Sequence, residues 1–144
     1  MTSIEKFEIK HLNEVINLQV QLGYLTNTDE FHNRIKNLEK TNSFSLYVII
    51  DDDGVSGFIA FEFLFTLQYN NPICHIMNLI VDQKKRGLGY GRFLLDKAKE
   101  LAKLINSPIL QLTSANIAER LYAHKFYKKY GFEKTGSRFT LKIA

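Results

Sequence analysis

Three glycines at alternate positions, flanked by basic residues, constrain the fold of this chain more than any other feature. Gly87, Gly89 and Gly91 lie in the segment KKRGLGYGR, residues 84–92, which contains no proline. An apolar, strand-like run at residues 73–81 precedes the segment, and an amphipathic helical pattern follows it to residue 105. Glycines let a ligand approach the backbone closely, and N–H groups at a helix start bind anions. The pattern predicts a strand, an anion-binding loop and a helix in direct succession.

The remaining pattern predicts an α/β fold, with a mixed sheet and helices on both faces. Strands are expected over residues 6–9, 44–50, 55–67, 73–81 and 109–113. Helices are expected over residues 12–22, 28–38, 89–105 and 116–130. Asp53-Gly54 predicts a hairpin turn between the second and third strands, and residues 132–142 are expected to close the sheet as a hairpin or pair of strands. The predicted order is β-α-α-β-β-β-α-β-α-β-β.

Length and composition favour a single globular domain over residues 1–144. The chain has 144 residues, of which 45% are hydrophobic and 24% charged. Its one cysteine, Cys74, excludes an intrachain disulfide and fits a reducing, cytoplasmic setting. No signal peptide or membrane-length apolar segment is expected, and no nucleic-acid-binding motif is recognised. The net charge of +4 fits either ordinary surface balance or an anionic ligand.

Several kinds of phosphate-binding loop can be compared with the glycine segment. A P-loop needs Gly-Lys-Ser/Thr, whereas Gly91 is followed by Arg92-Phe93. A Rossmann site has its glycine turn after the first strand, and this segment comes after several strands. A tight structural turn without a ligand leaves the clustered basic residues unexplained. These comparisons favour an anion site of another kind.

The segment resembles the coenzyme-binding signature of the GNAT acetyltransferase superfamily. Arg86-x-x-Gly89-x-Gly91 matches the Arg/Gln-x-x-Gly-x-Gly/Ala pattern of that family. The later block from Arg120 to Phe132, which contains Phe126-Tyr127-x-x-x-Gly131-Phe132, resembles its last motif. Together, the motifs and the element order cover nearly the whole chain. The turn at Tyr24 and the ending at Arg138 are similar to small-molecule members, including those acting on aminoalkylphosphonates.

The resemblance implies a GNAT-like acyl-CoA N-acyltransferase fold and an acetyl-CoA-dependent N-acetyltransferase. The acetyl group would pass to a primary amine of a small molecule by direct attack in a ternary complex. The implied coenzyme contacts are Leu79, Ile80 and Val81 for the pantetheine arm, Arg86, Gly87, Leu88, Gly89, Tyr90, Gly91 and Arg92 for the pyrophosphate, and also Arg120 and Tyr127. No metal is expected, because the four histidines show no ligand spacing.

The chemistry needs a group that removes a proton from the amine and a group that serves the departing thiolate. Tyr127 matches the family tyrosine that serves the thiolate, although its helical spacing with Phe126 and Tyr130 also fits simple packing. Many relatives carry a glutamate on the strand before the loop, where this chain has Met77 and Asn78. Asn78 could orient a water, and His75 is the nearby titratable group. The base therefore stays open among His75, an ordered water and bulk water.

Other interpretations stay open at the level of the sequence. Glu62 and Tyr24 are candidates for the acceptor pocket, but Glu62 also fits an exposed strand position. The missing glutamate favours a non-catalytic acetyl-CoA-binding regulatory module as an alternative. Acetylation of a protein N-terminus or lysine would use the same donor site. The sequence does not name the acceptor amine or decide between a monomer and a homodimer.

Overall fold

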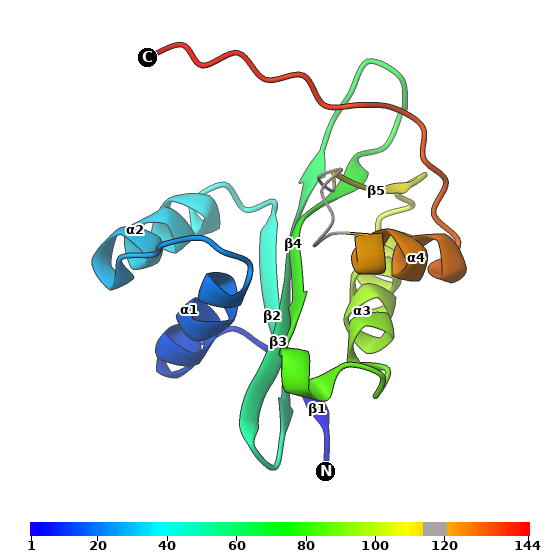
Figure 1. The fold of residues 1–144 in the computed structure, drawn as a ribbon. Coiled ribbons are helices and arrows are strands. Elements are labelled where there is room, and N and C mark those ends of the chain that lie inside the picture. The colour runs from blue at the N-terminus through cyan, green and yellow to red at the C-terminus, as the bar shows by residue number, and fades with distance from the viewer. Residues whose placement is uncertain (114–120) are drawn as a thin grey trace. The chain divides into compact units, whose positions relative to one another are not determined.

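The computed structural model describes residues 1–113 and 121–144, which form two units, Met1–Gln111 and Leu112–Ala144. The first unit contains a sheet in the order β1-β2-β3-β4-β5 (Figure 1). Its strands are β1 (Ser3–Lys6), β2 (Phe44–Asp51), β3 (Gly54–Leu64), β4 (Ile73–Val81) and β5 (Leu110–Leu112), which reaches the boundary of the unit. Its helices are η1 (Ile9–His11), α1 (Leu12–Gln21), α2 (Thr28–Glu39), η2 (Gln83–Lys85) and α3 (Tyr90–Leu104). The second unit contains α4 (Leu121–Tyr130).

The first four strands pair in series and antiparallel. The predicted hairpin is confirmed, since Asp51 pairs with Gly54 at its turn and Gly54 has a φ of 99°. Between β3 and β4 the register shifts: Ala60 lies opposite Asn78, whereas Phe61 lies opposite Ile76. Met77 is therefore the extra residue of a β-bulge in β4, a feature that bends a strand and changes where its side chains point.

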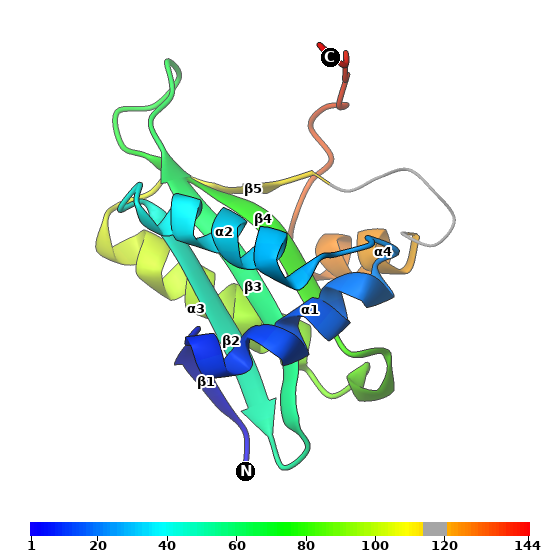
Figure 2. The same ribbon diagram turned by 90° about the vertical axis from the view of Figure 1, so that its left-hand side faces the viewer.

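Helices cover both faces of the sheet, as Figures 1 and 2 show. Helices α1 and α2 pack on one face and bury a core with alternate residues of the strands. Members of this core include Val15, Leu18, Ile35, Val48, Phe58 and Ile80. Helix α3 lies on the other face, where Leu94, Leu95 and Ala98 are fully buried. None of the helices in residues 1–113 and 121–144 is both long and apolar enough to cross a membrane.

Two expectations about the ends of the chain need correction. The first strand runs over Ser3–Lys6 rather than residues 6–9, because the N–H of Glu8 donates to Nδ1 of His11 at 3.0 Å and a 3-10 turn begins there. The two closing strands expected over residues 132–142 are not formed. A strand needs a hydrogen-bonding neighbour. The alternating Phe139, Leu141 and Ile143 find none in the described chain and are 94%, 84% and 92% exposed.

Three further expectations are not decided by these observations. The predicted helix start at residue 116 lies outside the described residues, although α4 confirms the rest of that helix. The single domain stays a prediction, as does the cytoplasmic location inferred from Cys74.

Cys74 is fully buried, and this burial raises the pKa of its thiol to about 12. The thiol is therefore protonated at neutral pH and is no nucleophile.

Gly57 in β3 provides a test of the packing between the sheet and α3. A Cβ atom at this position would lie 2.8 Å from the carbonyl oxygen of Ile80 and 3.1 Å from Cγ2 of Ile49. Gly57→Ala should therefore lower the free energy of unfolding by about 1–3 kcal/mol, as overpacked cores do. Gly136→Ala is the matched control, because a Cβ there has nothing within 4 Å. Thermal melting of both variants checks this expectation, and equal melting temperatures would contradict it.

Candidate functional site

The connection from β4 to the glycine segment is anchored at several points. The N–H of Asp82 donates to the carbonyl oxygen of Ser56 at 2.8 Å, which joins the end of β4 to β3. The side chain of Asp82 accepts from the N–H of Lys84 at 3.0 Å and so caps η2. The N–H of Gln83 donates to Oε1 of Gln21 at the end of α1, at 3.2 Å. These contacts fix the start of the loop to β3 and to the end of α1.

Two of the three glycines adopt a left-handed backbone. Gly87 has a φ of 82°, and Gly89, the N-cap of α3, has a φ of 86°. A Cβ at Gly87 would meet nothing within 4 Å, and one at Gly89 would meet only the ring of Phe93 at 3.7 Å. Within the described chain, the backbone conformation rather than lack of space therefore requires glycine at these positions.

The loop ends at the N-terminus of a 15-residue helix. The N–H of Phe93 donates to the carbonyl oxygen of Gly89 at 3.0 Å, so the amides of Tyr90 and Gly91 precede the first intrahelical bond. Arg86, Gly87, Leu88 and Gly89 are exposed, and so is Arg92 in the first turn of the helix. Aligned amides, the helix dipole and two arginines together suit an anion such as a pyrophosphate. The anion site stays a prediction, and these features are the ones on which it depends.

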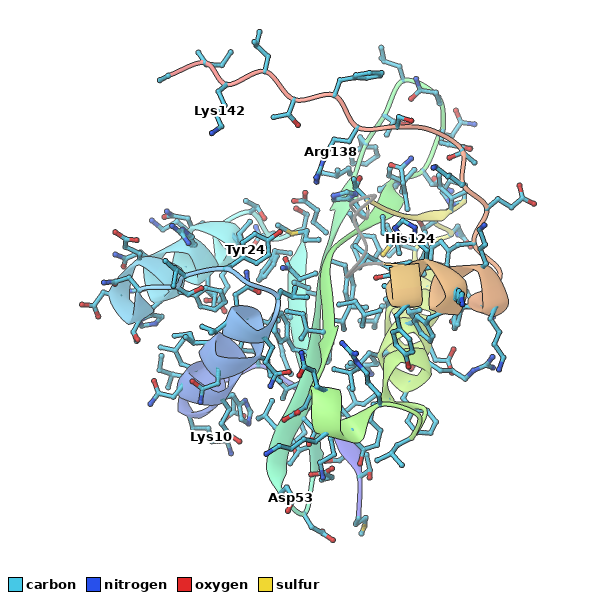
Figure 3. The ribbon with its side chains drawn as sticks, viewed as in Figure 1. Lys10, Tyr24, Asp53, His124, Arg138 and Lys142 are labelled. Atoms are coloured by element: carbon cyan, nitrogen blue, oxygen red, sulfur yellow. The ribbon has the colours of Figure 1, made fainter. Side chains whose placement is uncertain are left out.

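Lys85 belongs to the basic cluster in the sequence, but its side chain contacts two carboxylates of the protein itself. Its Nζ lies 2.9 Å from Oδ2 of Asp51 and 2.5 Å from Oδ2 of Asp53, at the β2–β3 hairpin. Figure 3 shows Asp53 at the tip of that hairpin. These two carboxylates raise the pKa of Lys85 further above its usual range. Lys85 therefore offsets part of the negative charge of the hairpin, and sequence reasoning missed this use of its charge.

Strand β4 offers part of one edge to a ligand. It has nine residues, whereas its neighbour β5 has three, so most of this edge has no strand beside it in the described chain. The N–H of Cys74 near the start of β4 donates to the carbonyl oxygen of Ile109 at 3.0 Å. Among the predicted pantetheine contacts, Ile80 has its side chain in the core, so it can offer only its backbone.

The register of β3 and β4 brings two candidate residues together. His75 lies directly opposite Glu62, and both side chains are half-buried. Ala60 and Asn78 form the next pair with the same facing, on the side of the sheet that α1 and α2 cover. The side-chain amide of Asn78 donates to Oε1 of Gln19 in α1 over a long 3.5 Å. The pairing of Glu62 with His75 was missed from the sequence, because it depends on the bulge at Met77.

Tyr24, the other candidate for the acceptor pocket, lies between α1 and α2 (Figure 3). Its side chain is 53% exposed. A half-exposed aromatic residue on a helix connection can contact a ligand, since a loop on a rigid scaffold is a common place for binding residues.

The second unit places Tyr127 in an aromatic cluster at the end of α4. Its ring lies 5.6 Å from that of Phe126 and 5.8 Å from that of Phe132, with the second pair edge to face. The N–H groups of Gly131 and Phe132 donate to its carbonyl oxygen at 3.1 and 3.0 Å and end the helix. The ring is half-buried, so it has a packing role whatever its hydroxyl does. Arg120 lies outside the described residues.

Residues 1–113 and 121–144 contain no group of three or more His, Cys, Asp or Glu side chains that could hold a metal ion. His75 has Glu62 as its cross-strand neighbour, and His11 accepts a hydrogen bond from the N–H of Glu8.

Comparison with known proteins gives consistent matches. The sequence model of the acetyltransferase (GNAT) domain family matches residues 42–134. An aminoalkylphosphonate N-acetyltransferase of Salmonella typhimurium is 36% identical over 86 residues, which are 60% of this chain and about half, 54%, of that protein. A Bacillus subtilis protein predicted to be a phosphinothricin acetyltransferase is 30% identical over 114 residues, covering 72% of this chain and 68% of that protein.

The solved structures agree on the fold. An aminoglycoside N-acetyltransferase in complex with CoA superimposes with a TM-score of 0.85 at 16% identity, covering 100% of this chain and 96% of that one. The α/β class predicted from the sequence is thereby confirmed. The family match spans β2 to α4 and includes both the glycine loop and the block around Tyr127. On these grounds, the chain belongs to the GNAT acetyltransferase family.

Proposed function

We propose that this protein transfers the acetyl group of acetyl-CoA to a primary amine of a small molecule, by direct attack in a ternary complex. The observation that carries the proposal is the loop at the start of α3 in a chain of the GNAT family. Its two left-handed glycines, its exposed arginines and the amides before the first intrahelical bond suit a pyrophosphate. The open edge of β4 suits an extended amide-containing arm, which can bind in the manner of an added strand.

The acceptor amine is proposed to bind on the α1/α2 face, near Glu62 and His75. An ammonium group is attracted by the half-buried carboxylate of Glu62, and the imidazole of His75 is the group beside it that can take a proton. The neutral amine then attacks the thioester carbonyl carbon, and the carbon–sulfur bond breaks. The hydroxyl of Tyr127 is proposed to give its proton to the departing thiolate, and the proton that the nitrogen loses as the amide forms restores the phenol.

The relatives support a small amine-bearing acceptor. The names of two of them include an aminoalkylphosphonate and an aminoglycoside as substrates. A non-catalytic coenzyme-binding regulator is the alternative, and the side chains at Met77 and Asn78, neither of which is a base, favour it. Thiol-release kinetics with acetyl-CoA and a panel of amines, aminophosphonates and peptides separates the two. Coenzyme binding without thiol release for any amine would support the regulator.

Gly89→Val tests the coenzyme loop. A β-branched residue at a φ of 86° is strained, so the loop should change its backbone and its amides should no longer converge on the pyrophosphate. Titration calorimetry should show that the affinity for CoA is lost. Gly136→Val is the control, because position 136 has open space and no left-handed φ. Unchanged affinity in Gly89→Val would exclude this loop as the coenzyme site.

Tyr127→Phe tests the proton donor. The variant keeps the ring and its contacts with Phe126 and Phe132 but removes the hydroxyl. Turnover should fall by about 10² to 10⁴, the usual effect of losing a general acid, while CoA affinity and melting temperature change little. Tyr127→Ala should lower the melting temperature as well. If Tyr127→Phe turns over its acceptor at a near-normal rate, Tyr127 only packs.

Glu62→Gln tests the acceptor subsite. Removing the carboxylate should raise KM for a cationic amine about 10-fold, the effect of one lost hydrogen bond to a charged group. KM for acetyl-CoA should stay the same, since that substrate is proposed to bind elsewhere on β4. Glu39→Gln at the exposed end of α2 is the control for the charge change alone. Steady-state kinetics with each substrate varied separately provides the measurement, and equal effects in both variants would contradict this role.

A further inference from the structure

A single carboxylate oxygen joins the two ends of the glycine loop. Oδ2 of Asp51, at the end of β2, lies 2.9 Å from Nζ of Lys85 and accepts a hydrogen bond from the hydroxyl of Tyr90 at 2.8 Å. Lys85 is the residue just before the loop at residues 86–89, and Tyr90 is the residue just after it. The loop is therefore closed at its base by two side chains that meet at one atom.

This junction is well buried although the loop is exposed. The side chains of Asp51 and Lys85 are 8% and 19% exposed, and Tyr90 is 8% exposed. The ammonium of Lys85, and then the hydroxyl of Tyr90, hold the pKa of Asp51 well below its usual range. Asp51 is therefore ionised throughout the neutral range. Charge-assisted hydrogen bonds in such a site are stronger and geometrically more specific than exposed ones.

The hairpin that carries Asp51 is itself fixed to the core. The N–H of Asp53 donates to Oδ1 of Asp51 at 2.9 Å and orients its carboxylate. On the next strand, the N–H of Val55 donates to Oε2 of Glu14 in α1 at 2.8 Å. The carbonyl oxygen of Ser56 accepts from the N–H of Asp82 at the end of β4. Asp51 thus has a stable frame from which to hold the loop.

We propose that Asp51 is a positioning residue for coenzyme binding, which fixes the separation of Lys85 and Tyr90 so that the amides between them converge on one anion. This inference rests on the proposed function, in which the loop holds the coenzyme pyrophosphate. A loop with two left-handed glycines has many alternative conformations when unbound. Closing its base removes much of that freedom before the ligand arrives, which raises affinity by preorganisation.

A role of Asp51 through its charge and a role through positioning the loop predict opposite changes in CoA affinity when Asp51 is made neutral. A negative charge near an anion site weakens binding, so its loss alone should make CoA bind more tightly. Loss of positioning should make CoA bind more weakly. Asp52→Asn provides the matched control, because Asp52 is the next residue on the hairpin and its contact is with the N-terminal amine at 3.1 Å.

Titration calorimetry with CoA should show a Kd about 10-fold higher for Asp51→Asn than for the wild type, as for one lost hydrogen bond to a charged group. Asp52→Asn should bind CoA as the wild type does or slightly more tightly. In steady-state kinetics, Asp51→Asn should raise KM for acetyl-CoA and leave kcat unchanged at saturation, because the reacting groups are untouched. A merely structural role would lower the melting temperature without this split.

Tyr90→Phe keeps the buried ring and removes one of the two bonds to Asp51, so it decides the question if Asp51→Asn does not fold. It should weaken CoA binding by less than Asp51→Asn, and the double variant should be no worse than Asp51→Asn alone. If the wild type binds CoA and both single variants bind it equally well or more tightly, the inference is wrong but the proposed function survives. If the wild type itself does not bind CoA, both are wrong.

Discussion

Burial of β3 on both faces is the constraint on which the rest of the structure depends. Every residue from Val55 to Phe61 is buried, with Ile59 and Phe61 at 0% exposure. Burying an apolar side chain of this size stabilises the fold by about 2–3 kcal/mol, so this strand needs cover from helices on both sides. Because β3 is central, its antiparallel partners β2 and β4 are fixed in register with it. Apart from Glu62 on β3 itself and Tyr24 between α1 and α2, the site residues of the first unit lie on these partners or in the loop and helix start that follow β4.

The register then determines which side chains lie next to one another along β4. The bulge at Met77 sets Glu62 opposite His75, and the pair lies near the start of the strand. The basic loop follows the other end of the strand, at Val81. Asp51 lies at the end of β2 and is brought to that loop by the hairpin turn at Gly54. The arginines of the loop and the carboxylate of Glu62 are thus held near opposite ends of one strand.

The local features of the fold could be read from the sequence, and the non-local ones could not. The turn at Gly54, the glycine loop and the helix after Gly89 depend on residues close in sequence, whose conformational preferences are strong. The bulge at Met77 and the contact from Asp51 to Lys85 depend on how separate strands align. No short pattern encodes that alignment. The closing strands predicted over residues 132–142 are wrong, since apolar residues such as Phe139 and Leu141 at alternate positions specify a face but supply no pairing partner.

The loop arginines and Glu62, near opposite ends of β4, favour one orientation of the proposed acetyl donor relative to the proposed acceptor amine. From His75 to Val81 is six residues, or about 20 Å of extended strand. Phosphates are repelled by the carboxylate of Glu62 and attracted to the loop, whereas an ammonium group has the opposite preference. An extended donor aligned with β4 would therefore place its phosphates at the loop and direct its acyl end toward the acceptor amine. Because the loop and Glu62 together distinguish this orientation from its reverse, no carboxylate is needed at position 77 or 78 to bring the proposed reactants together. Such a residue would matter only for removal of a proton from the amine.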